Sequence, residues 1–285
     1  MKIDLHLHTT HSDGNWSPTE LVAHAIKLKM DVIAITDHDT VSGIDEGVLA
    51  AGDNLEIIPA VEINTIWTDD EGFGEDIHIL GYFIDKTNAK LSELLQRQRA
   101  ARLQQVERLV AILNEEGIPI SMALVRSFAK GGPIGKVHVT NAIVAAGGAP
   151  DVSAAYARFY DRNSKYFVAR QSVTPIEAID AIRAAGGLTS IAHPGMSSAQ
   201  DHSDLIKQLT LCGLNGIEAY HSAHSDESVS KLLALADRLN LLVTGGSDCH
   251  GPFEEYESLM GTVAVPSDVV ARLKLARADF APAST

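Results

Sequence analysis

The segment IDLHLH, residues 3–8, sets two histidines two positions apart. Successive side chains of an extended chain point to opposite sides, so His6 and His8 share a face with Asp4, and the two imidazoles lie about 6.6 Å apart along the strand. The residues that alternate with them are isoleucine and leucine, so we expect the other face to be buried. One face of this predicted strand therefore carries nitrogen and oxygen ligands of the kind that divalent metal ions prefer.

Histidines and carboxylates recur at corresponding places along the chain. Most of them close a predicted strand or follow it directly, while Asp13 lies in the loop after the first strand and His78 lies inside a strand. Parallel barrels gather their functional side chains at the carboxyl ends of several strands, so we expect these groups to meet at one rim. The candidates are His6, His8, Asp13, His38, Glu62, His78, His193, Asp248 and His250.

Six imidazoles and three carboxylates at one rim require a counter-ion. A single histidine in such a place is as readily explained by a structural hydrogen bond. Taken together, however, unpaired buried polar groups would each cost about 1 to 3 kcal/mol, and divalent cations remove that cost. Histidine and carboxylate ligands suit Mn²⁺, Zn²⁺ or Fe²⁺. Nine ligands exceed one tetrahedral centre, so we predict two or three metal ions, a device that recurs in displacement at phosphorus.

The overall charge limits the partners. A formal net charge of −14 argues against binding to duplex DNA, which depends on a basic surface. Bound metals invert the local potential, because three divalent ions on three carboxylates leave a net charge of about +3. A phosphorylated small molecule therefore remains a suitable substrate for an acidic protein.

Alternating short β-like and helical patterns predict βα units, an α/β fold and a parallel sheet. Capping boxes at SPTE, residues 17–20, and TPIE, residues 174–177, mark two helix starts. Residues 85–171 show helical periodicity without convincing strands, so we expect a helical insert that could cover the rim, with barrel parts at 1–84 and 172–285. The predicted strands are residues 3–8, 32–37, 56–63, 76–84, 188–194, 216–221 and 242–250.

Composition is that of a globular protein, with 45% hydrophobic and 21% charged residues. No apolar run approaches the roughly 18 residues that span a bilayer, and strand-like sequence begins at Ile3 without room for a signal peptide. We therefore expect a cytoplasmic protein without a membrane partner. The two cysteines, Cys212 and Cys249, form no CxxC pair and are expected to be small core residues.

Six motifs in order, DLHLHTTHSDG, AITDHDT, VEI, IHILGY, IAHPG and TGGSDCHG, resemble those of the polymerase and histidinol phosphatase (PHP) family of metal-dependent phosphoesterases. The resemblance covers both parts of the predicted barrel and leaves the insert loosely similar. It implies a distorted (β/α)7 barrel with a trinuclear metal site, most often Mn²⁺. It also implies three ligand groups: His6, His8, Glu62 and Asp248; Glu62, His78 and His193; and Asp13, His38 and His250.

Within the family, a helical insert after the fourth strand resembles the branch that acts on nucleotides. The resemblance implies removal of the 3′-phosphate from AMP-like 3′,5′-nucleoside bisphosphates, or trimming of short RNA from its 5′ end, by a hydroxide that bridges two metals. It also implies phosphate binding by Arg99, Arg102, Lys136 and His138. The chain departs from the branch at Lys136, His138 and Asn141, where Arg-x-His and a later arginine are common, which leaves the exact substrate open.

Each of these basic residues also has a structural explanation. Arg99 and Arg102 lie three apart on one helical face and suit a shared anion, yet a solvated charged stripe explains them equally well. Lys136 and His138 follow glycines, which favours substrate contact over a bare turn.

Two further residues complete the predicted site. His221 and His224 flank the end of the sixth predicted strand, and we expect His224 to donate a proton to the leaving alkoxide. Asp37, like Asp4, adjoins a candidate ligand and is expected to orient an imidazole N–H, with ordinary strand-end hydrogen bonding as the alternative.

Three rival functions share parts of this pattern. A histidinol-phosphate phosphatase has the same metal site but needs an amine-binding pocket. An amidohydrolase barrel also has an HxH motif, but it requires an eighth strand and commonly a bridging lysine. A non-catalytic nucleotide sensor would bind without releasing phosphate, and the complete ligand set argues against it.

Overall fold

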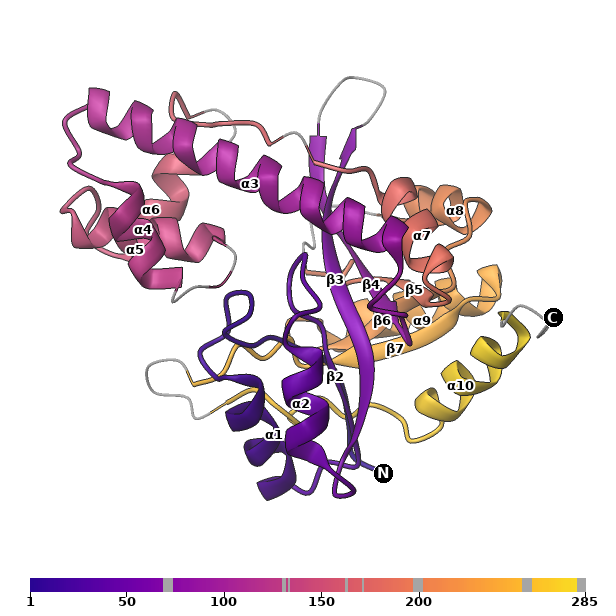
Figure 1. Cartoon of the computed structure of the whole chain (residues 1–285). Helices are drawn as coiled ribbons and strands as arrows, with labels where there is room; N and C mark the ends of the chain where they lie inside the picture. The colour runs from indigo at the N-terminus through magenta and orange to yellow at the C-terminus, as the bar shows by residue number, and fades with distance from the viewer. Residues whose placement is uncertain are drawn as a thin grey trace.

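The computed structural model describes residues 1–68, 74–129, 132, 134–161, 164–170, 172–196, 202–252 and 258–280. In these residues seven strands form one sheet in chain order. The strands are β1 (Ile3–Leu7), β2 (Val32–Ile35), β3 (Glu56–Thr68), β4 (Gly74–Tyr82), β5 (Leu188–Ile191), β6 (Gly216–His221) and β7 (Leu242–Gly246). A bridge from Leu7 to Cys249, where His8 N–H donates to Cys249 O at 3.0 Å, brings the two edges together into a nearly closed barrel (Figure 1).

The expectation of a wholly parallel sheet was wrong at β4. This strand pairs antiparallel with β3 and with β5, whereas the other neighbours are parallel. The physical reason is the short link between Thr68 and Gly74, which has no room for the crossover helix that parallel neighbours need. The two strands therefore form a long hairpin in which His78 lies opposite Asn64.

Helices cover the outside of the barrel. The two predicted capping boxes are present: Ser17 and Glu20 cap the first helix, and Thr174 and Glu177 cap the seventh. In each, the hydroxyl accepts the N–H three residues on while the glutamate accepts the N–H of the cap residue. The barrel helices are α1 (Pro18–Lys27), α2 (Ile44–Ala51), α7 (Pro175–Ala184), α8 (Ser203–Leu211), α9 (Asp226–Leu239) and α10 (Val269–Phe280).

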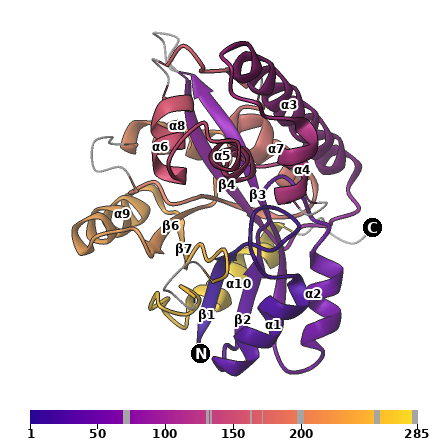
Figure 2. The same ribbon diagram turned by 90° about the vertical axis from the view of Figure 1, so that its left-hand side faces the viewer.

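Between β4 and α7 the described residues form helices and no strand, as predicted. The helices are α3 (Ala89–Glu115), α4 (Met122–Ala129), α5 (Lys136–Ala145) and α6 (Val152–Phe159). The N-terminal part of α3 packs into the barrel core through Leu91, Leu94 and Leu95, whereas its C-terminal part shares a separate core with α4 to α6. Because α3 belongs to both cores, it carries the insert over the end of the molecule far from the N-terminus (Figures 1 and 2).

The first strand is buried throughout, but its apolar side chains do not all share one environment. Ile3 and Leu5 pack in one apolar cluster with Tyr82 and α10, while Leu7 packs in another beneath α1. The pairing of β1 with β2 shifts register between Asp4 and Leu7, which explains the change. No helix among the described residues is both long and apolar enough to cross a membrane.

Candidate metal centre

Glu62 lies at the centre of the predicted ligands, with no exposed surface. It comes from β3, and a bridge between His38 and Glu62 brings the segment after β2 beside it. Five imidazole nitrogens surround its two oxygens. His38 Nδ1, His6 Nε2 and His8 Nε2 lie 2.9, 3.2 and 3.2 Å from Oε2, and His78 Nδ1 and His193 Nε2 lie 2.8 and 3.2 Å from Oε1. One carboxylate therefore connects elements from both parts of the barrel.

The other two carboxylates extend the cluster. Asp248 Oδ1 lies 3.0 Å from His8 Nε2 and 3.4 Å from His6 Nε2. Asp13 Oδ1 lies 3.3 Å from His250 Nε2, and Asp13 Oδ2 lies 3.8 Å from His38 Nε2. The structure thus brings all nine predicted ligands into one continuous set.

The hydrogen bonding of this set is incomplete in a specific way. Several of its buried atoms point at one another yet have no hydrogen-bond partner among the described residues: His6 Nε2, His8 Nε2, Asp13 Oδ1, His38 Nδ1, Glu62 Oε2 and Asp248 Oδ1. Ligand atoms within 4.8 Å of one another form groups that include His8, Asp13, His38 and His250 together, and His38, Glu62 and His78 together. Converging imidazole nitrogens and carboxylate oxygens without hydrogen-bond partners fit divalent metal ions of the Mn²⁺, Zn²⁺ or Fe²⁺ type.

The cluster also shapes its own protonation. Burial by itself would raise the pKa of Glu62, but the charges of His38 and His6 outweigh it and hold that pKa well below its usual range. The same balance holds the pKa of Asp248 well below its usual range. Burial alone would lower the pKa of His250, whereas Asp13 raises it to about 10. The imidazoles thus act as counter-ions that a metal would replace.

Glu218 belongs to this centre, although the sequence did not single it out. It lies in β6 and is fully buried. Its carboxylate accepts a hydrogen bond from His6 Nδ1 at 3.0 Å and from the backbone N–H of His193 at 2.8 Å. A carboxylate that holds the far nitrogen of a ligand imidazole fixes the ring and its tautomer. The available signal was position, because Glu218 is the one charged residue inside the run GIEAYH.

The predicted orienting role of Asp4 and Asp37 on imidazoles was wrong in its detail. Asp4 accepts from the backbone N–H groups of Ser247 and Gly261, at 2.8 and 3.0 Å. Asp37 accepts from Thr9 and from the hydroxyl of Ser12. Both carboxylates therefore fix segments that carry candidate ligands, because backbone N–H groups and hydroxyls, rather than imidazoles, are the donors within reach.

His224 is held away from the predicted proton-donating role. Its Nδ1–H donates to Ala219 O at 2.9 Å, and its Nε2 accepts from Gly195 N–H at 3.1 Å. Both nitrogens are occupied by backbone, and burial lowers the pKa of the ring. The neighbouring His221, which was not chosen as the proton donor, points into the cluster instead. Its buried Nε2 lies 3.6 Å from Asp248 Oδ2.

Two predicted basic residues are linked to the candidate metal centre through Asp39, which directly follows the candidate ligand His38. Arg102 donates to the Asp39 carboxylate, and Arg99 Nη1 donates to Asp39 O at 3.0 Å. Asp39 is buried and takes a left-handed backbone conformation with φ of 54°. Helix α3 is thereby tied to the loop that carries His38.

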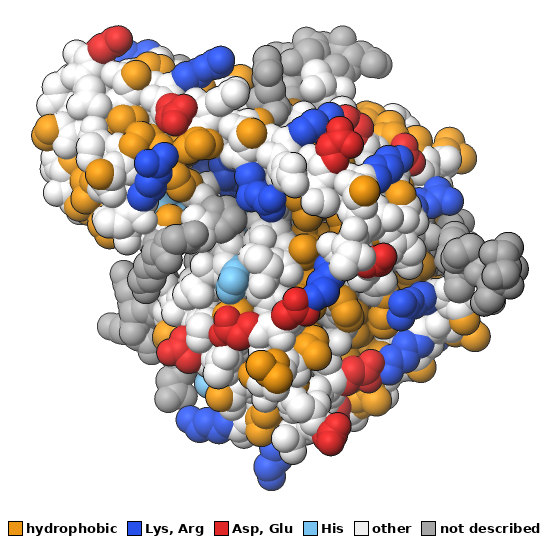
Figure 3. Space-filling view, in the orientation of Figure 1, with side chains coloured by type: hydrophobic (Ala, Val, Ile, Leu, Met, Phe, Trp, Pro, Cys, Tyr) orange, Lys and Arg blue, Asp and Glu red, His pale blue; other side chains and the backbone are white. Residues whose placement is uncertain are grey.

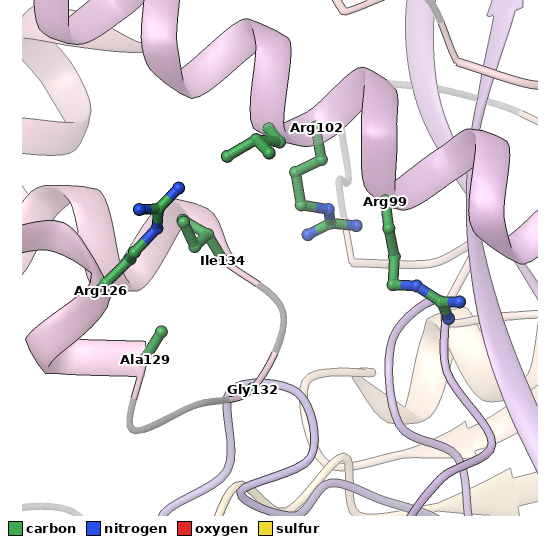
Figure 4. Close-up of a pocket in the computed structure, with 7 residues that line it drawn as sticks. Arg99, Arg102, Arg126, Ala129, Gly132 and Ile134 are labelled. Atoms are coloured by element: carbon green, nitrogen blue, oxygen red, sulfur yellow. The ribbon is translucent and has the colours of Figure 1, made fainter. Parts of the chain in front are cut away.

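These arginines line a cavity of about 310 Å³ between α3 and α4. Figure 4 shows Arg126 of α4 across this cavity from Arg102, with Arg99 turned toward the barrel loops. Arg126 was not predicted from the sequence. Because Arg99, Arg102 and Arg126 all line this cavity, we call it the three-arginine cavity. Lys and Arg side chains gather where the insert meets the barrel (Figure 3). The positive charge of this region therefore lies beside the candidate ligands.

The other two predicted basic residues lie elsewhere. Lys136 Nζ donates to Asp76 at 2.8 Å, and Arg170 approaches the same carboxylate at 3.8 Å. His138 is buried and its Nδ1 accepts from Gly135 N–H at 2.9 Å, so it helps to start α5. Neither lines the three-arginine cavity, but His138 lines a second cavity together with Asp13 and His250.

The chain is similar to several known proteins. A family model described as the PHP domain matches residues 4–168. The chain is 34% identical to a 5′-3′ exoribonuclease of Haemophilus influenzae, covering 88% of this chain and 90% of that protein. It is 32% identical to a phosphoribosyl 1,2-cyclic phosphate 1,2-diphosphodiesterase of Eggerthella lenta, covering 88% of this chain and 94% of that protein. It is 30% identical to a 3′,5′-nucleoside bisphosphate phosphatase of Chromobacterium violaceum, covering 93% of this chain and 92% of that protein.

A solved structure agrees with these sequences. A protein of Bifidobacterium adolescentis, classed as a metal-dependent phosphoesterase, superimposes with a TM-score of 0.85 at 33% identity, covering 96% of each chain. The family match spans more than half of this chain, and the relatives cover most of it. The barrel, the converging ligands and these similarities together show that this chain belongs to the PHP family and is a metal-dependent phosphoesterase.

Proposed function

We propose that the protein hydrolyses phosphate esters of nucleotides, either converting 3′,5′-nucleoside bisphosphates to 5′-nucleotides and phosphate or trimming short RNA from its 5′ end. The observation that carries this proposal is the three-arginine cavity, whose Arg99 and Arg102 are fixed on Asp39, the residue after His38. A substrate with one phosphate at the metal centre and a second phosphate nearby fits that arrangement. Relatives named as acting on RNA and on nucleoside bisphosphates support it.

The proposed ligands are Glu62 and the eight residues around it, which together make up the three groups implied by the family resemblance. When bound, divalent ions supply an activated water and neutralise charge on the reacting phosphate. The chain's own residues orient that chemistry. Glu218 fixes the ring of His6, and the guanidinium groups of Arg99 and Arg102 hold the phosphate that does not react.

A phosphate-release screen with Mn²⁺ tests the proposal. The substrates are a 3′,5′-nucleoside bisphosphate, a 5′-monophosphorylated dinucleotide, histidinol phosphate and phosphoribosyl 1,2-cyclic phosphate. We expect turnover of one or both nucleotide substrates. Turnover confined to histidinol phosphate or to the cyclic sugar phosphate would contradict the nucleotide assignment, and tight nucleotide binding without turnover would indicate a sensor.

A variant of the unpredicted arginine sharpens the test. Arg126→Ala removes one wall of the cationic cavity, so it should raise the KM for the bisphosphate about tenfold, since a hydrogen bond to a charged group contributes about 1.5 to 3 kcal/mol. The KM for 4-nitrophenyl phosphate, which has no second phosphate, should not change. Arg108→Ala is the matched control, because Arg108 is an exposed arginine of α3 and does not line the cavity.

A further inference from the structure

A second cavity, of about 540 Å³, opens between the barrel and the insert. One wall is the loop after β1 together with two of the proposed metal ligands, Asp13 and His250. The facing wall comes from the insert, where α4, α5 and α6 stand over the loops of the barrel (Figure 1). The cavity therefore adjoins the metal centre directly.

Its insert wall differs in chemistry from the three-arginine cavity. It is lined by two aromatic side chains, Phe128 and Tyr156, and by the amide of Asn141. Among the residues that the structure describes, the Asn141 side chain has no hydrogen-bond partner, although it is only partly exposed. Burial and the nearby charge of Asp13 raise the pKa of Tyr156 to about 12, so its hydroxyl stays neutral. Among the lining residues that the structure describes, the wall thus offers aromatic surface, the Asn141 amide and the ring of His138, and no arginine or lysine.

Ala129 at the end of α4 lines both cavities. Two compartments of different chemistry therefore lie side by side next to one metal centre. One is cationic and suits a phosphate. The other is aromatic, carries an amide, and has the volume that small-molecule sites commonly have, about 300 to 1,000 Å³.

We propose that this aromatic cavity binds the nucleobase of the substrate, with the ring against Tyr156 or Phe128 and its polar edge on the Asn141 amide. The inference rests on the proposed function, whose substrates combine a reacting phosphate, a second phosphate and a base. A base has a flat face that stacks on aromatic side chains and donor and acceptor atoms that match an amide. A sugar phosphate without a base would leave both features of the wall unused.

Equilibrium binding to the Mn²⁺-loaded protein separates the base from the rest of the ligand. Calorimetry with adenosine 5′-monophosphate and with ribose 5-phosphate gives the contribution of the base as a ratio of dissociation constants. We expect the nucleotide to bind at least about tenfold more tightly, in line with stacking on an aromatic side chain. Tyr156→Ala and Asn141→Ala should each reduce that ratio at least about threefold while leaving ribose 5-phosphate binding unchanged.

Phe167→Ala is the control. Phe167 is an aromatic residue of the insert with 39% exposure, against 37% for Tyr156, and it does not line the cavity. Its variant should keep the wild-type ratio. Equal binding of the two ligands by the wild-type protein, or a ratio unaffected by both Tyr156→Ala and Asn141→Ala, would overturn the base site.

The two proposals fail in different ways. If the protein turns over phosphate esters but binds the nucleotide and the sugar phosphate equally, the base site is wrong and the phosphoesterase remains. If it binds the nucleotide through Tyr156 and Asn141 yet releases no phosphate from any nucleotide, the base site stands and the proposed reaction is wrong.

Discussion

The carboxylate of Glu218 accepts a hydrogen bond from His6 Nδ1 at 3.0 Å, inside a barrel where neither side chain has exposed surface. The opposite nitrogen of the same ring, Nε2, faces Glu62 and Asp248. One imidazole is thus held from behind by a carboxylate while its opposite nitrogen faces the candidate metal centre. The pair links β6 to β1 across the barrel, and we expect Glu218 to support metal binding by fixing the ring of His6.

Replacing Glu218 by glutamine tests that relationship. The amide keeps the shape but weakens the hold on His6, so metal affinity should fall about 10- to 100-fold. Titration of the metal-free protein with Mn²⁺ measures the change. Ser190→Ala is the control, because Ser190 is buried in β5 and bonds to Thr244 rather than to a ligand. Equal affinity of Glu218→Gln and wild type would show that Glu218 is merely a buried carboxylate.

We expect substitutions of His221 and of His224 to have different effects, the first on kcat and the second on stability. His221 Nε2 enters the cluster beside Asp248, whereas both nitrogens of His224 are bonded to backbone. His221→Ala should lower kcat at least about tenfold. His224→Ala should mainly lower the free energy of unfolding, because it leaves Ala219 O and Gly195 N–H without their partner. Steady-state rates and urea unfolding of both variants decide the matter, and a larger loss of kcat in His224→Ala would restore it as the proton donor.

The ion pair between Arg102 and Asp39 should contribute strongly to stability. Both side chains are nearly buried, at 10% and 1% exposure, so removing one leaves a buried charge unpaired. Arg102→Met should lower the free energy of unfolding by about 3 kcal/mol. Arg97, which lies in α3 like Arg102, pairs with Glu177 of α7, but these two side chains are 55% and 44% exposed. Arg97→Met should therefore cost less than about 1 kcal/mol. Equal costs in urea unfolding would contradict this account of α3.

Metal binding should release protons at neutral pH. In the metal-free protein, burial opposes protonation of His6, but Glu218 and Glu62 raise its pKa well above the usual value, and Asp13 raises the pKa of His250 to about 10. These rings are therefore protonated at pH 7, and a metal must displace their protons. Affinity should rise between pH 6 and pH 9. Calorimetry in buffers of different ionisation enthalpy counts the protons, and a count of zero at pH 7 would show that the rings were already neutral.

Much of the fold could be predicted because its signals are local. Ser17 and Thr174 each precede a proline and a glutamate at capping distance, and both helices begin there. The alternation around His6 and His8 identified β1 and its ionisable face. The antiparallel β4 was missed because the motif around His78 resembles any buried strand, and only the short link to β3 reveals the reversal.

The parts of the site that were missed depend on contacts between distant residues. Arg102 and Asp39 are 63 positions apart, and His6 and Glu218 are 212 apart, so neither partner marks the other in the sequence. His221 and His224 are close neighbours of the same type, but His221 ends β6 with its ring near Asp248, whereas His224 lies after the strand and bonds to backbone. Local patterns therefore point to candidate ligands at strand ends more readily than to the residues that support them.

The most direct test of the metal centre is the metal content of active protein, measured by elemental analysis beside its phosphoesterase rate. We expect two or three transition-metal ions per chain. A chelator should remove the ions and abolish turnover, and the variants His78→Ala and Asp13→Ala should each bind fewer ions. Full turnover by protein that carries no transition metal and is unaffected by chelators would contradict the account.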